Sequence, residues 1–299
     1  MIASSGERAF LAERPRLIGL AYRLLGSLSD AEDVVQEAWL RWSRVDVDQI
    51  ERPGAWLTTV VSRLGLDRLR ARRREQVDYV GPWLPEPFVR PMHLDDPHQV
   101  AELSDSLTTA FLVMLERLSP DERLTILLVD VFAEPFASVA HLLGKSEDAC
   151  RQIAVRARRK LLALRANGDQ VHRPPQEQMA LAAAFVGAVM SADLGAVRAM
   201  LASDAVLTSD GGPHRHAARR PVVGPDRIAR FLVNLARRLP PEATFEPVWV
   251  NGSPGAMSSI AGRPYMVTVI EFMGDLVVRQ YSMLNPDKLA AIGRDIEFV

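Results

Sequence analysis

The sequence predicts a multidomain fold in which two all-helical domains are followed by an α+β domain. Apolar residues recur every three or four positions from Phe10 to Arg74 and again from Asp105 onwards, the spacing of amphipathic helices. Five prolines between Gln76 and Glu102 prevent a long helix and predict an extended linker. Beyond Pro174-Pro175 a helical stretch gives way to short β-like runs, which indicates a domain of another class. The expected segments are a first domain at 1–77, a linker at 78–104, a second domain at 105–168, a linker at 169–175 and a third domain at 176–299.

The composition favours a soluble chain whose charge is concentrated locally. Of the 299 residues, 48% are hydrophobic and 24% are charged, and the formal net charge is −1. No apolar run reaches the ~18 residues of a membrane span, and the first residues lack the layout of a signal peptide. We therefore expect a cytoplasmic protein without membrane contact. Cys150 is the only cysteine, which excludes disulfides within the chain and any cysteine-cluster metal site, and we expect neither a metal nor a cofactor.

Two helix starts are recognisable in the first domain. Asp30 is expected to cap a helix whose first turn carries acidic residues, which complement the positive end of the helix dipole. Pro53 is expected to open another helix that runs into the arginine-rich segment 67–74. Three tryptophans follow the same helical spacing as the valines and leucines. We interpret them as core residues rather than as stacking platforms for single-stranded nucleic acid: Trp39, Trp42 and Trp56.

The second domain carries a helix-turn-helix pattern. Ser119-Pro120-Asp121-Glu122 combines a capping residue with a proline at the first helical position. A helix is expected from Pro135 to Leu143, and Gly144 ends it. Ser146 then caps a helix from Glu147 to about Leu164. A short helix, a glycine turn and an arginine-bearing helix therefore follow one another as in DNA-binding proteins.

The third domain is expected to begin with helix and to continue as a sheet. Residues from Glu177 to Leu201 keep helical spacing. Four β-like runs follow, separated by glycine and proline signals: Ala205–Thr208, Thr244–Val250, Met266–Glu271 and Leu276–Tyr281.

Two helices concentrate arginine, at 67–74 and at 151–160. A chain of net charge −1 that gathers cations twice is expected to present two separate surfaces to a polyanion, of which DNA is the commonest. The second helix is the clearer case, because no acidic residue occurs from Arg151 to Arg165 to pair with its arginines. Its first turns are expected to reach base edges and its later turns to meet phosphates: Arg151, Gln152, Val155 and Arg156, then Arg158, Arg159 and Lys160.

The first basic helix leaves two alternatives open. Asp67 can pair with neighbouring arginines, so a solvated charged face and a DNA contact that includes Arg73 are equally good interpretations. Neither the spacing nor the composition of the segment separates the two.

Motifs in both helical domains resemble those of bacterial extracytoplasmic-function (ECF) sigma factors. Residues 30–38 (Asp-Ala-Glu-Asp-Val-Val-Gln-Glu-Ala), 53–57 (Pro-Gly-Ala-Trp-Leu) and 67–70 (Asp-Arg-Leu-Arg) are similar to region 2 of that family. Residues 118–123 (Leu-Ser-Pro-Asp-Glu-Arg), with the helix-turn-helix through 156–161, are similar to region 4. The resemblance implies promoter-specific transcription initiation with core RNA polymerase.

The resemblance also implies residue roles. Region 2 would dock on the clamp helices of the polymerase largest subunit through a polar face: Asp33, Gln36, Glu37 and Arg41. It would hold the melted −10 element through the segment 46–52 and one helix face: Ser62, Arg63, Asp67 and Arg70. Region 4 would read the −35 element in the major groove and contact the polymerase flap, while the linker threads the polymerase interior.

Three further motifs resemble the ECF group with a fused SnoaL-like domain: Trp83-Leu84-Pro85-Glu86-Pro87, Asp210-Gly211-Gly212 and Asn285-Pro286-Asp287-Lys288-Leu289. The resemblance implies a cone-shaped α+β domain, with a curved sheet and helices around a cavity. Such a domain would act as a built-in regulator that packs on the sigma domains or senses a small ligand, with the three motifs at the interdomain contact. That group usually continues Asp-Gly-Gly with Gly-Lys, whereas this chain has Pro213-His214.

An enzymatic role for the third domain is the alternative. Some SnoaL-like enzymes use an aspartate and a histidine, and Asp210, His214 and His216 lie close together in the sequence. A histidine beside a carboxylate can shuttle protons. We favour a glycine-rich turn with solvated histidines, because nearness along a loop does not establish a shared pocket.

Overall fold

The computed structural model describes residues 5–75, 79–91, 107–164 and 174–293, which divide into two compact units. The helical unit combines residues 5–75 with 110–164, so both predicted helical domains contribute to it. The second unit combines 79–91 and 107–109 with 174–293. The linker residues 79–91 thus group with the third predicted domain, and the domain boundaries given by the sequence stay predictions.

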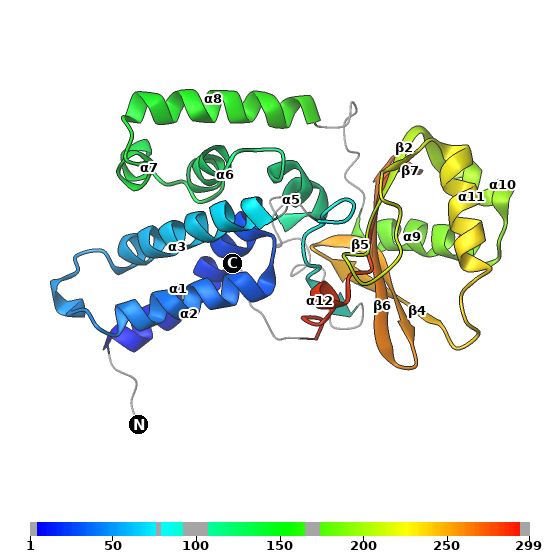
Figure 1. Ribbon diagram of the computed structural model, residues 1–299, viewed down its shortest axis with the longest axis horizontal. Coiled ribbons are helices and arrows are strands. Elements are labelled where there is room, and N and C mark those ends of the chain that lie inside the picture. Colours follow the sequence, from blue (N-terminus) through cyan, green and yellow to red (C-terminus); the bar gives the residue numbers. More distant parts are fainter. Residues whose placement is uncertain (1–4, 76–78, 92–106, 165–173, 294–299) are drawn as a thin grey trace. The chain divides into compact units, whose positions relative to one another are not determined.

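Three long helices form the first half of the helical unit (Figure 1): α1 (Ser5–Leu25), α2 (Leu28–Trp42) and α3 (Pro53–Glu75). The three helices pack on one another, and a 3-10 turn, η1 (Val47–Gln49), precedes α3. Trp42 is buried and lies 5.3 Å from Trp56, measured between ring centroids. Trp39 packs on Phe10 with 4.8 Å between ring centroids. The tryptophans therefore pack within the unit, as expected.

The start of α2 differs from the prediction, which placed the cap at Asp30. Ser27 is the capping residue, because its hydroxyl oxygen accepts a hydrogen bond from the Asp30 N–H at 3.1 Å. Gly26 follows α1 in the left-handed conformation, with φ of 67°, and Ser27 is then extended, which is the backbone that a cap requires. The Asp30 carboxylate instead accepts from the Arg68 guanidinium at 2.6 Å.

Shorter helices form the second half of the helical unit: α5 (Thr109–Leu115), α6 (Pro120–Ile126), the π-helical turn η5 (Leu127–Val131), α7 (Phe136–Leu143) and α8 (Glu147–Leu164). The predicted start signals are confirmed. Ser119 and Glu122 form a reciprocal capping box at the start of α6. Gly144 ends α7 with φ of 64°, and the Ser146 hydroxyl oxygen accepts from the Ala149 N–H at the start of α8.

The second unit contains, in its described part, a seven-stranded sheet in the order β1-β4-β5-β6-β7-β2-β3. The strands are β1 (Val89–Pro91), β2 (Leu201–Asp210), β3 (Val222–Val223), β4 (Thr244–Val250), β5 (Ser253–Ile260), β6 (Arg263–Met273) and β7 (Leu276–Met283). Neighbouring strands are antiparallel except β2 and β7, which are parallel. The linker strand β1 therefore extends the sheet beyond β4.

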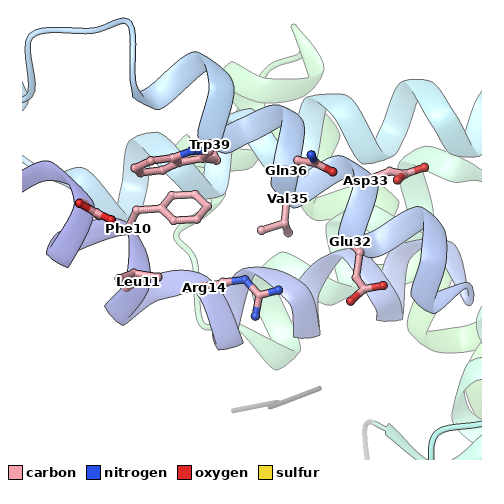
Figure 2. Close-up of a pocket in the computed structure, with 9 residues that line it drawn as sticks. Phe10, Leu11, Arg14, Glu32, Asp33, Val35, Gln36 and Trp39 are labelled. Atoms are coloured by element: carbon pink, nitrogen blue, oxygen red, sulfur yellow. The ribbon is translucent and has the colours of Figure 1, made fainter. Parts of the chain in front are cut away.

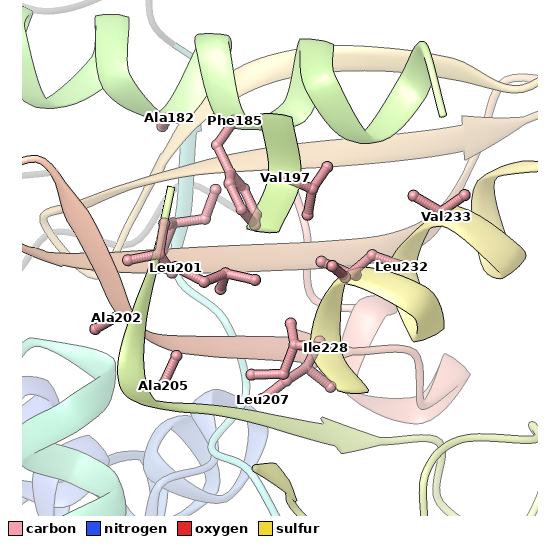
Figure 3. Close-up of a cluster of buried hydrophobic side chains, with 13 residues drawn as sticks. Ala182, Phe185, Val197, Leu201, Ala202, Ala205, Leu207, Ile228, Leu232 and Val233 are labelled. Carbon is pink, nitrogen blue, oxygen red and sulfur yellow. The ribbon is translucent and has the colours of Figure 1, made fainter. Parts of the chain in front are cut away.

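Helices α9 (Pro175–Met190), α10 (Leu194–Ala199) and α11 (Pro225–Ala236) accompany the sheet, and α12 (Pro286–Leu289) follows β7. Thirteen buried apolar side chains from α9, α10, α11 and the sheet pack together (Figure 3). Phe185 of α9, Leu207 of β2 and Ile270 of β6 are each no more than 1% exposed. This cluster forms the packed core between these helices and the sheet.

The sequence missed five elements of this unit and misplaced one boundary. Helices α11 and α12 and strands β1, β3 and β5 were not predicted. Strand β5 contains Gly255, where a Cβ atom would lie 2.2 Å from the Thr268 carbonyl oxygen of β6, so its glycine is a packing requirement and not a turn signal. Leu201, expected to end a helix, is the first residue of β2.

Candidate functional site

The exposed face of α8 carries the residues predicted to read DNA. Cys150, Ile153, Ala154 and Ala157 are buried and attach α8 to the helical unit. The side chains on the opposite face are exposed: Arg151, Gln152, Val155, Arg156 and Arg159. Because residues three and four apart share a helix face, this arrangement presents a continuous strip with arginine, glutamine and an apolar side chain. Such a strip has the chemistry that major-groove base edges require.

Acidic residues nevertheless pair with α8, although none lies within 151–165. Arg151 binds Glu147 and Asp148, each at 2.8 Å. The partners of the later cations come from the preceding helices: Arg158 binds Asp130 of η5 at 2.5 Å, and Lys160 binds Glu122 of α6 at 2.8 Å. The sequence argument compared neighbours along the chain only, and so missed these partners. Arg158 and Lys160 are about half exposed, at 49% and 51%, so their ion pairs are open to exchange with phosphate.

Two of the three arginines in the last turn of α3, Arg72 and Arg73, donate into the helical unit. The Arg72 guanidinium donates to the Leu25 carbonyl oxygen and lies 3.2 Å from a Glu116 oxygen. Arg73 donates to the Leu118 carbonyl oxygen. Arg123 of α6, which is fully buried, binds the same Glu116 oxygen at 2.5 Å and donates to the Arg23 carbonyl oxygen at 2.9 Å. Arg73, one of the predicted DNA contacts, thus donates its hydrogen bond to a backbone group inside the helical unit.

Charges in this network shift one another's protonation. Burial alone would raise the pKa of Glu116, but the positive charges of Arg123 and Arg72 outweigh it and hold the pKa below its ordinary value. Burial also lowers the pKa of Arg72. Together, Arg72, Glu116 and Arg123 form a largely buried charge network that joins the two helical halves.

The residues predicted to hold the −10 element lie against the second half of the helical unit. Arg70 binds Asp121 of α6 at 2.9 Å, and an Arg63 nitrogen lies 3.4 Å from the His141 ring of α7. Asp67 remains 78% exposed. Ser62 of the same helix is fully buried, which removes it from any surface contact in this arrangement. The segment 46–52 contains η1, where the Gln49 side chain donates to Asp46 at 2.7 Å.

Two of the four residues predicted to bind polymerase, Asp33 and Gln36, line a hollow of about 570 Å³ between α1 and α2. Figure 2 shows Phe10, Leu11, Val35 and Trp39 around this hollow, together with Arg14, Glu32, Asp33 and Gln36. The other two candidates, Glu37 and Arg41, form an exposed ion pair at 3.0 Å along α2. The face therefore combines apolar side chains with acidic and amide groups.

In the second unit, the three SnoaL-like motifs meet at the Asp210 carboxylate, which is fully buried. One oxygen accepts from the Tyr79 hydroxyl at 2.6 Å and from the Gly212 N–H at 3.0 Å. The other accepts from the Leu84 N–H at 2.8 Å and binds the Lys288 ammonium at 2.6 Å. We call the set Tyr79, Leu84, Asp210, Asn285 and Lys288 the linker clamp.

Lys288 joins the clamp to the linker in three ways. Besides the Asp210 ion pair, its ammonium donates to the Leu84 carbonyl oxygen and lies 3.9 Å from the centroid of the Trp83 ring. Because Lys288 is only 6% exposed, Asp210 compensates a charge that water does not reach. Burial and the hydrogen bond to Asp210 raise the pKa of Tyr79, which keeps the phenol protonated as a donor.

Glycine is required at both positions that follow Asp210. A Cβ atom on Gly211 would lie 2.2 Å from the Arg215 carbonyl oxygen. Gly212 has φ of 58°, and a Cβ atom there would lie 2.5 Å from the Asn285 side-chain nitrogen. Asn285 in turn donates to the Tyr79 hydroxyl oxygen at 3.1 Å and accepts from the Asp287 N–H, which starts α12.

The remaining motif residues complete the same contact. Four of them are buried: Pro85, Glu86, Pro87 and Leu289. Asp287 is exposed and lies 3.7 Å from His214. Pro286 is the first residue of α12. Sequence reasoning missed Tyr79 and Asn251, whose side-chain oxygen accepts from the Phe88 N–H at 3.2 Å. A tyrosine beside the proline-rich segment was the available signal for the first.

The predicted aspartate and histidines do not form an acid–base pair. Asp210 accepts three hydrogen bonds within the clamp and a fourth from the Gly212 N–H, whereas the His214 side chain is 60% exposed and lies 3.7 Å from Asp287. His216 is also exposed. The preferred interpretation of solvated histidines therefore agrees with the structure, although Asp210 is an anchor for the linker and not part of a simple turn.

Comparison with known proteins supports this organisation. Residues 9–75 match the family "Sigma-70 region 2" and residues 108–161 match "Sigma-70, region 4". The ECF RNA polymerase sigma factor SigJ of Mycobacterium tuberculosis is 40% identical over 292 residues, which cover 93% of this chain and 91% of SigJ. A probable ECF sigma factor SigI of the same species is 35% identical over 62% of this chain and 63% of its own.

The crystal structure of M. tuberculosis SigJ is similar to the fold described above. It matches with a TM-score of 0.74 and 37% identity, over 96% of this chain and 99% of that one. None of the helices in the described residues is long and apolar enough to cross a membrane. With both sigma regions present in order and the similarity extending through the C-terminal domain, the chain belongs to the extracytoplasmic-function sigma factors of RNA polymerase, which direct promoter-specific initiation of transcription.

Proposed function

We propose that this sigma factor is regulated through its own linker, which the C-terminal domain holds in the linker clamp. The observation that carries the proposal is the bonding of Leu84 by both partners of a buried ion pair, Asp210 through the N–H and Lys288 through the carbonyl oxygen. A backbone group held by buried charges does not detach without leaving those charges unsatisfied. The linker is therefore either fully docked or released.

Region 4 is proposed to read the −35 element through α8, with Arg151, Gln152, Val155 and Arg156 at base edges and Arg159 and Lys160 at phosphates. The exposed strip of α8 supports this assignment. Lys160 has to leave Glu122, and Arg151 has to leave Glu147 and Asp148, before either can bind DNA fully. Binding to DNA therefore requires these surface ion pairs to break, and breaking an exposed ion pair costs little free energy.

Region 2 is proposed to bind the clamp helices of core polymerase with Asp33, Gln36, Glu37 and Arg41, and the −10 element with Arg63, Asp67 and Arg70. The hollow beside Asp33 and Gln36 supports the first assignment, since an apolar floor with carboxylates at its edge suits a basic amphipathic partner. The pairs Arg70–Asp121 and Arg63–His141 occupy the second surface. Promoter melting thus requires α6 and α7 to leave α3.

Linker release and the separation of these helices are proposed to be coupled through chain length. The linker joins the end of α3 at Glu75 to the start of α5 at Thr109. While residues 79–91 are docked, they cannot extend, so fewer linker residues remain to span the distance between α3 and α5. A clamp that holds the linker therefore limits how far region 4 can move from region 2.

Run-off transcription with purified core polymerase tests the proposal. The full chain is compared with a version that ends at Asp169 and with Lys288→Met, which removes the ammonium but keeps an unbranched apolar side chain. Arg230→Ala, on the exposed side of α11, is the matched control. We expect the truncated chain and Lys288→Met to change promoter-dependent transcription in the same direction, and the control to match the parent. Equal transcription by all four proteins would remove the regulatory role.

An enzymatic role in the C-terminal domain remains the second candidate, because carboxylate–histidine sites occur in SnoaL-like enzymes. The geometry gives it little support. Asp210 accepts four hydrogen bonds, including one from a buried ammonium, so both of its oxygens are already engaged in holding the linker. No specific observation in the described residues favours turnover of a small molecule over the linker clamp.

A further inference from the structure

We propose that the second unit contains a binding pocket for a small phosphorylated ligand, between the loop after β2 and the start of the linker. A hollow of about 190 Å³ lies there, lined by loop residues 211–219, by Ser209 and by Val80 and Gly81 of the linker. We call it the oxyanion pocket. It is separate from the hollow on α1 and α2 and from the clamp carboxylate, which does not line it.

The loop that forms the pocket is held in shape by its own hydrogen bonds. The Arg215 N–H donates to the Gly211 carbonyl oxygen at 3.1 Å, and the Ala218 N–H donates to the Ser209 hydroxyl oxygen at 3.0 Å. On the linker side, Gly81 has φ of 83°, and a Cβ atom there would lie 3.5 Å from the Arg219 backbone. The pocket therefore exists before a ligand arrives, which lowers the cost of binding.

The polar side chains that line the pocket belong to one serine, two histidines and two arginines. Ser209 is 3% exposed, and because its oxygen accepts from Ala218, its hydroxyl can still donate one hydrogen bond. His214, His216 and Arg219 form the walls, and no acidic residue lines the pocket in the described residues. Arg215 is already engaged, since it donates to the Tyr265 carbonyl oxygen at 2.5 Å and lies over the Tyr265 ring.

Charge and size together select the ligand. Two carboxylates lie close by: Asp287 is 3.7 Å from His214, and Asp210, between Ser209 and Gly211 in the chain, is paired with the Lys288 ammonium at 2.6 Å. Arg219 and the buried Ser209 hydroxyl are left to bind an anion, and an arginine guanidinium matches the oxygens of a phosphoryl group. The volume suits one or two phosphoryl groups better than a nucleic acid strand, so we commit to a small phosphorylated molecule.

A ligand in this pocket would touch the loop and the linker at once. Because Val80 and Gly81 form one wall, bound ligand stabilises the docked linker over the released one. The binding site itself does not depend on the sigma function, and its test measures binding and not transcription. If the proposed regulation through the linker is also correct, binding of this ligand is the signal that controls linker docking.

The test uses the full chain and isothermal titration with inorganic phosphate, pyrophosphate and acetate, and in a separate arm a short single-stranded DNA. We expect pyrophosphate to bind most tightly. Arg219→Ala should weaken its binding by about tenfold or more, the ratio that corresponds to the loss of one charge-assisted hydrogen bond. Arg230→Ala on α11 serves as the control for a general loss of positive charge and should bind as the parent does.

Hydrogen exchange adds a second readout. The Leu84 N–H donates to Asp210, so its exchange reports linker docking, and pyrophosphate should slow it in the parent and in Arg230→Ala but not in Arg219→Ala. Equal binding of pyrophosphate by Arg219→Ala and Arg230→Ala, or no binding by the parent, would overturn the pocket. Tighter binding of DNA than of pyrophosphate, with the same loss in Arg219→Ala, would overturn the choice of a small ligand.

Discussion

The arginines at the end of α3 and those along α8 differ in where their guanidinium groups go. Arg72 and Arg73 donate to backbone carbonyl oxygens and lie beside the largely buried Glu116, whereas Arg151 and Arg158 are about half exposed and bind carboxylates at the surface. In the sequence the two segments look alike. The comparison teaches that an arginine cluster can serve cohesion or recognition, and that burial of the arginine side chains themselves separates the two.

The largest expected effect tests cohesion at α3. Arg72→Ala should destabilise the helical unit by about 3 kcal/mol, because Glu116 then keeps one of its two cations and stays buried. Arg74→Ala, two residues on and exposed, is the matched control and should change stability by less than about 0.5 kcal/mol. Urea unfolding measures both. Equal losses of unfolding free energy in the two variants would show that the end of α3 presents an ordinary solvated face.

Acid should weaken the same network. The pKa of Glu116 is depressed in the folded chain, so its contribution to stability is present above the ordinary glutamate pKa and is lost as pH falls through the lower, folded value. We expect the melting temperature to fall below about pH 4 in the parent. Glu116→Gln should be less stable at neutral pH and should lose part of this acid dependence. An unchanged acid profile in that variant would assign the dependence to other carboxylates.

Recognition by α8 is tested next, in holoenzyme with core polymerase. Arg151→Ala should cost about 1–3 kcal/mol of promoter binding and relax preference at one −35 position. Folding stability should stay near that of the parent, because Arg151 is half exposed. A series of base-substituted promoters measures the preference. If every promoter loses affinity equally, Arg151 contacts phosphate and not a base.

Phosphate contact by α8 should show in the salt dependence. Arg159→Ala is expected to weaken all duplexes similarly and to reduce the slope of log affinity against log salt by about one. Arg159 is exposed, and the change should leave promoter preference unaltered. Anisotropy titrations of holoenzyme at several salt concentrations measure the slope. A preference change with a constant slope would contradict the assignment.

The smallest effect is expected from the surface pair between Arg158 and Asp130. Although the hydrogen bond to Asp130 raises the pKa of Arg158, the arginine is 49% exposed and solvent screens the pair. Arg158→Ala should therefore cost less than about 1 kcal/mol of unfolding free energy. Urea unfolding of Arg158→Ala beside Arg72→Ala gives the direct contrast. A loss as large as that of Arg72→Ala would abolish the distinction between the two helices.

Local signals in the sequence located most of the helical unit. Ser119, Gly144 and Ser146 act on backbone groups within a few residues, so their caps and turns can be read from a short window. Asp30 failed as a cap because Gly26 and Ser27, just upstream, already provide one. The capped, arginine-rich helix pattern predicted the candidate residues on α8, whereas the family resemblance supplied regions 2 and 4 and the candidate residues on α2 and α3.

Contacts between residues that lie far apart in the sequence could not be predicted from local patterns. Glu122 and Asp130 approach α8 only after α6 and η5 fold, and Glu116 meets Arg72 across the helical unit. Strand β5 was hidden because the glycine that its close approach to β6 requires resembles a turn residue. The three SnoaL-like motifs were grouped by resemblance, but their meeting at one carboxylate follows from chain topology that no local pattern encodes.

The pairing of β1 with β4 carries a consequence for solubility. Val89–Pro91 covers the outer backbone of Val248–Val250, so the docked linker closes one edge of the sheet. A released linker would leave that edge with unpaired N–H and C=O groups, next to the largely buried Trp249. Open edges of this kind template strand addition between molecules. The freed form of the protein is therefore expected to self-associate as its concentration rises, unless another chain occupies the edge first.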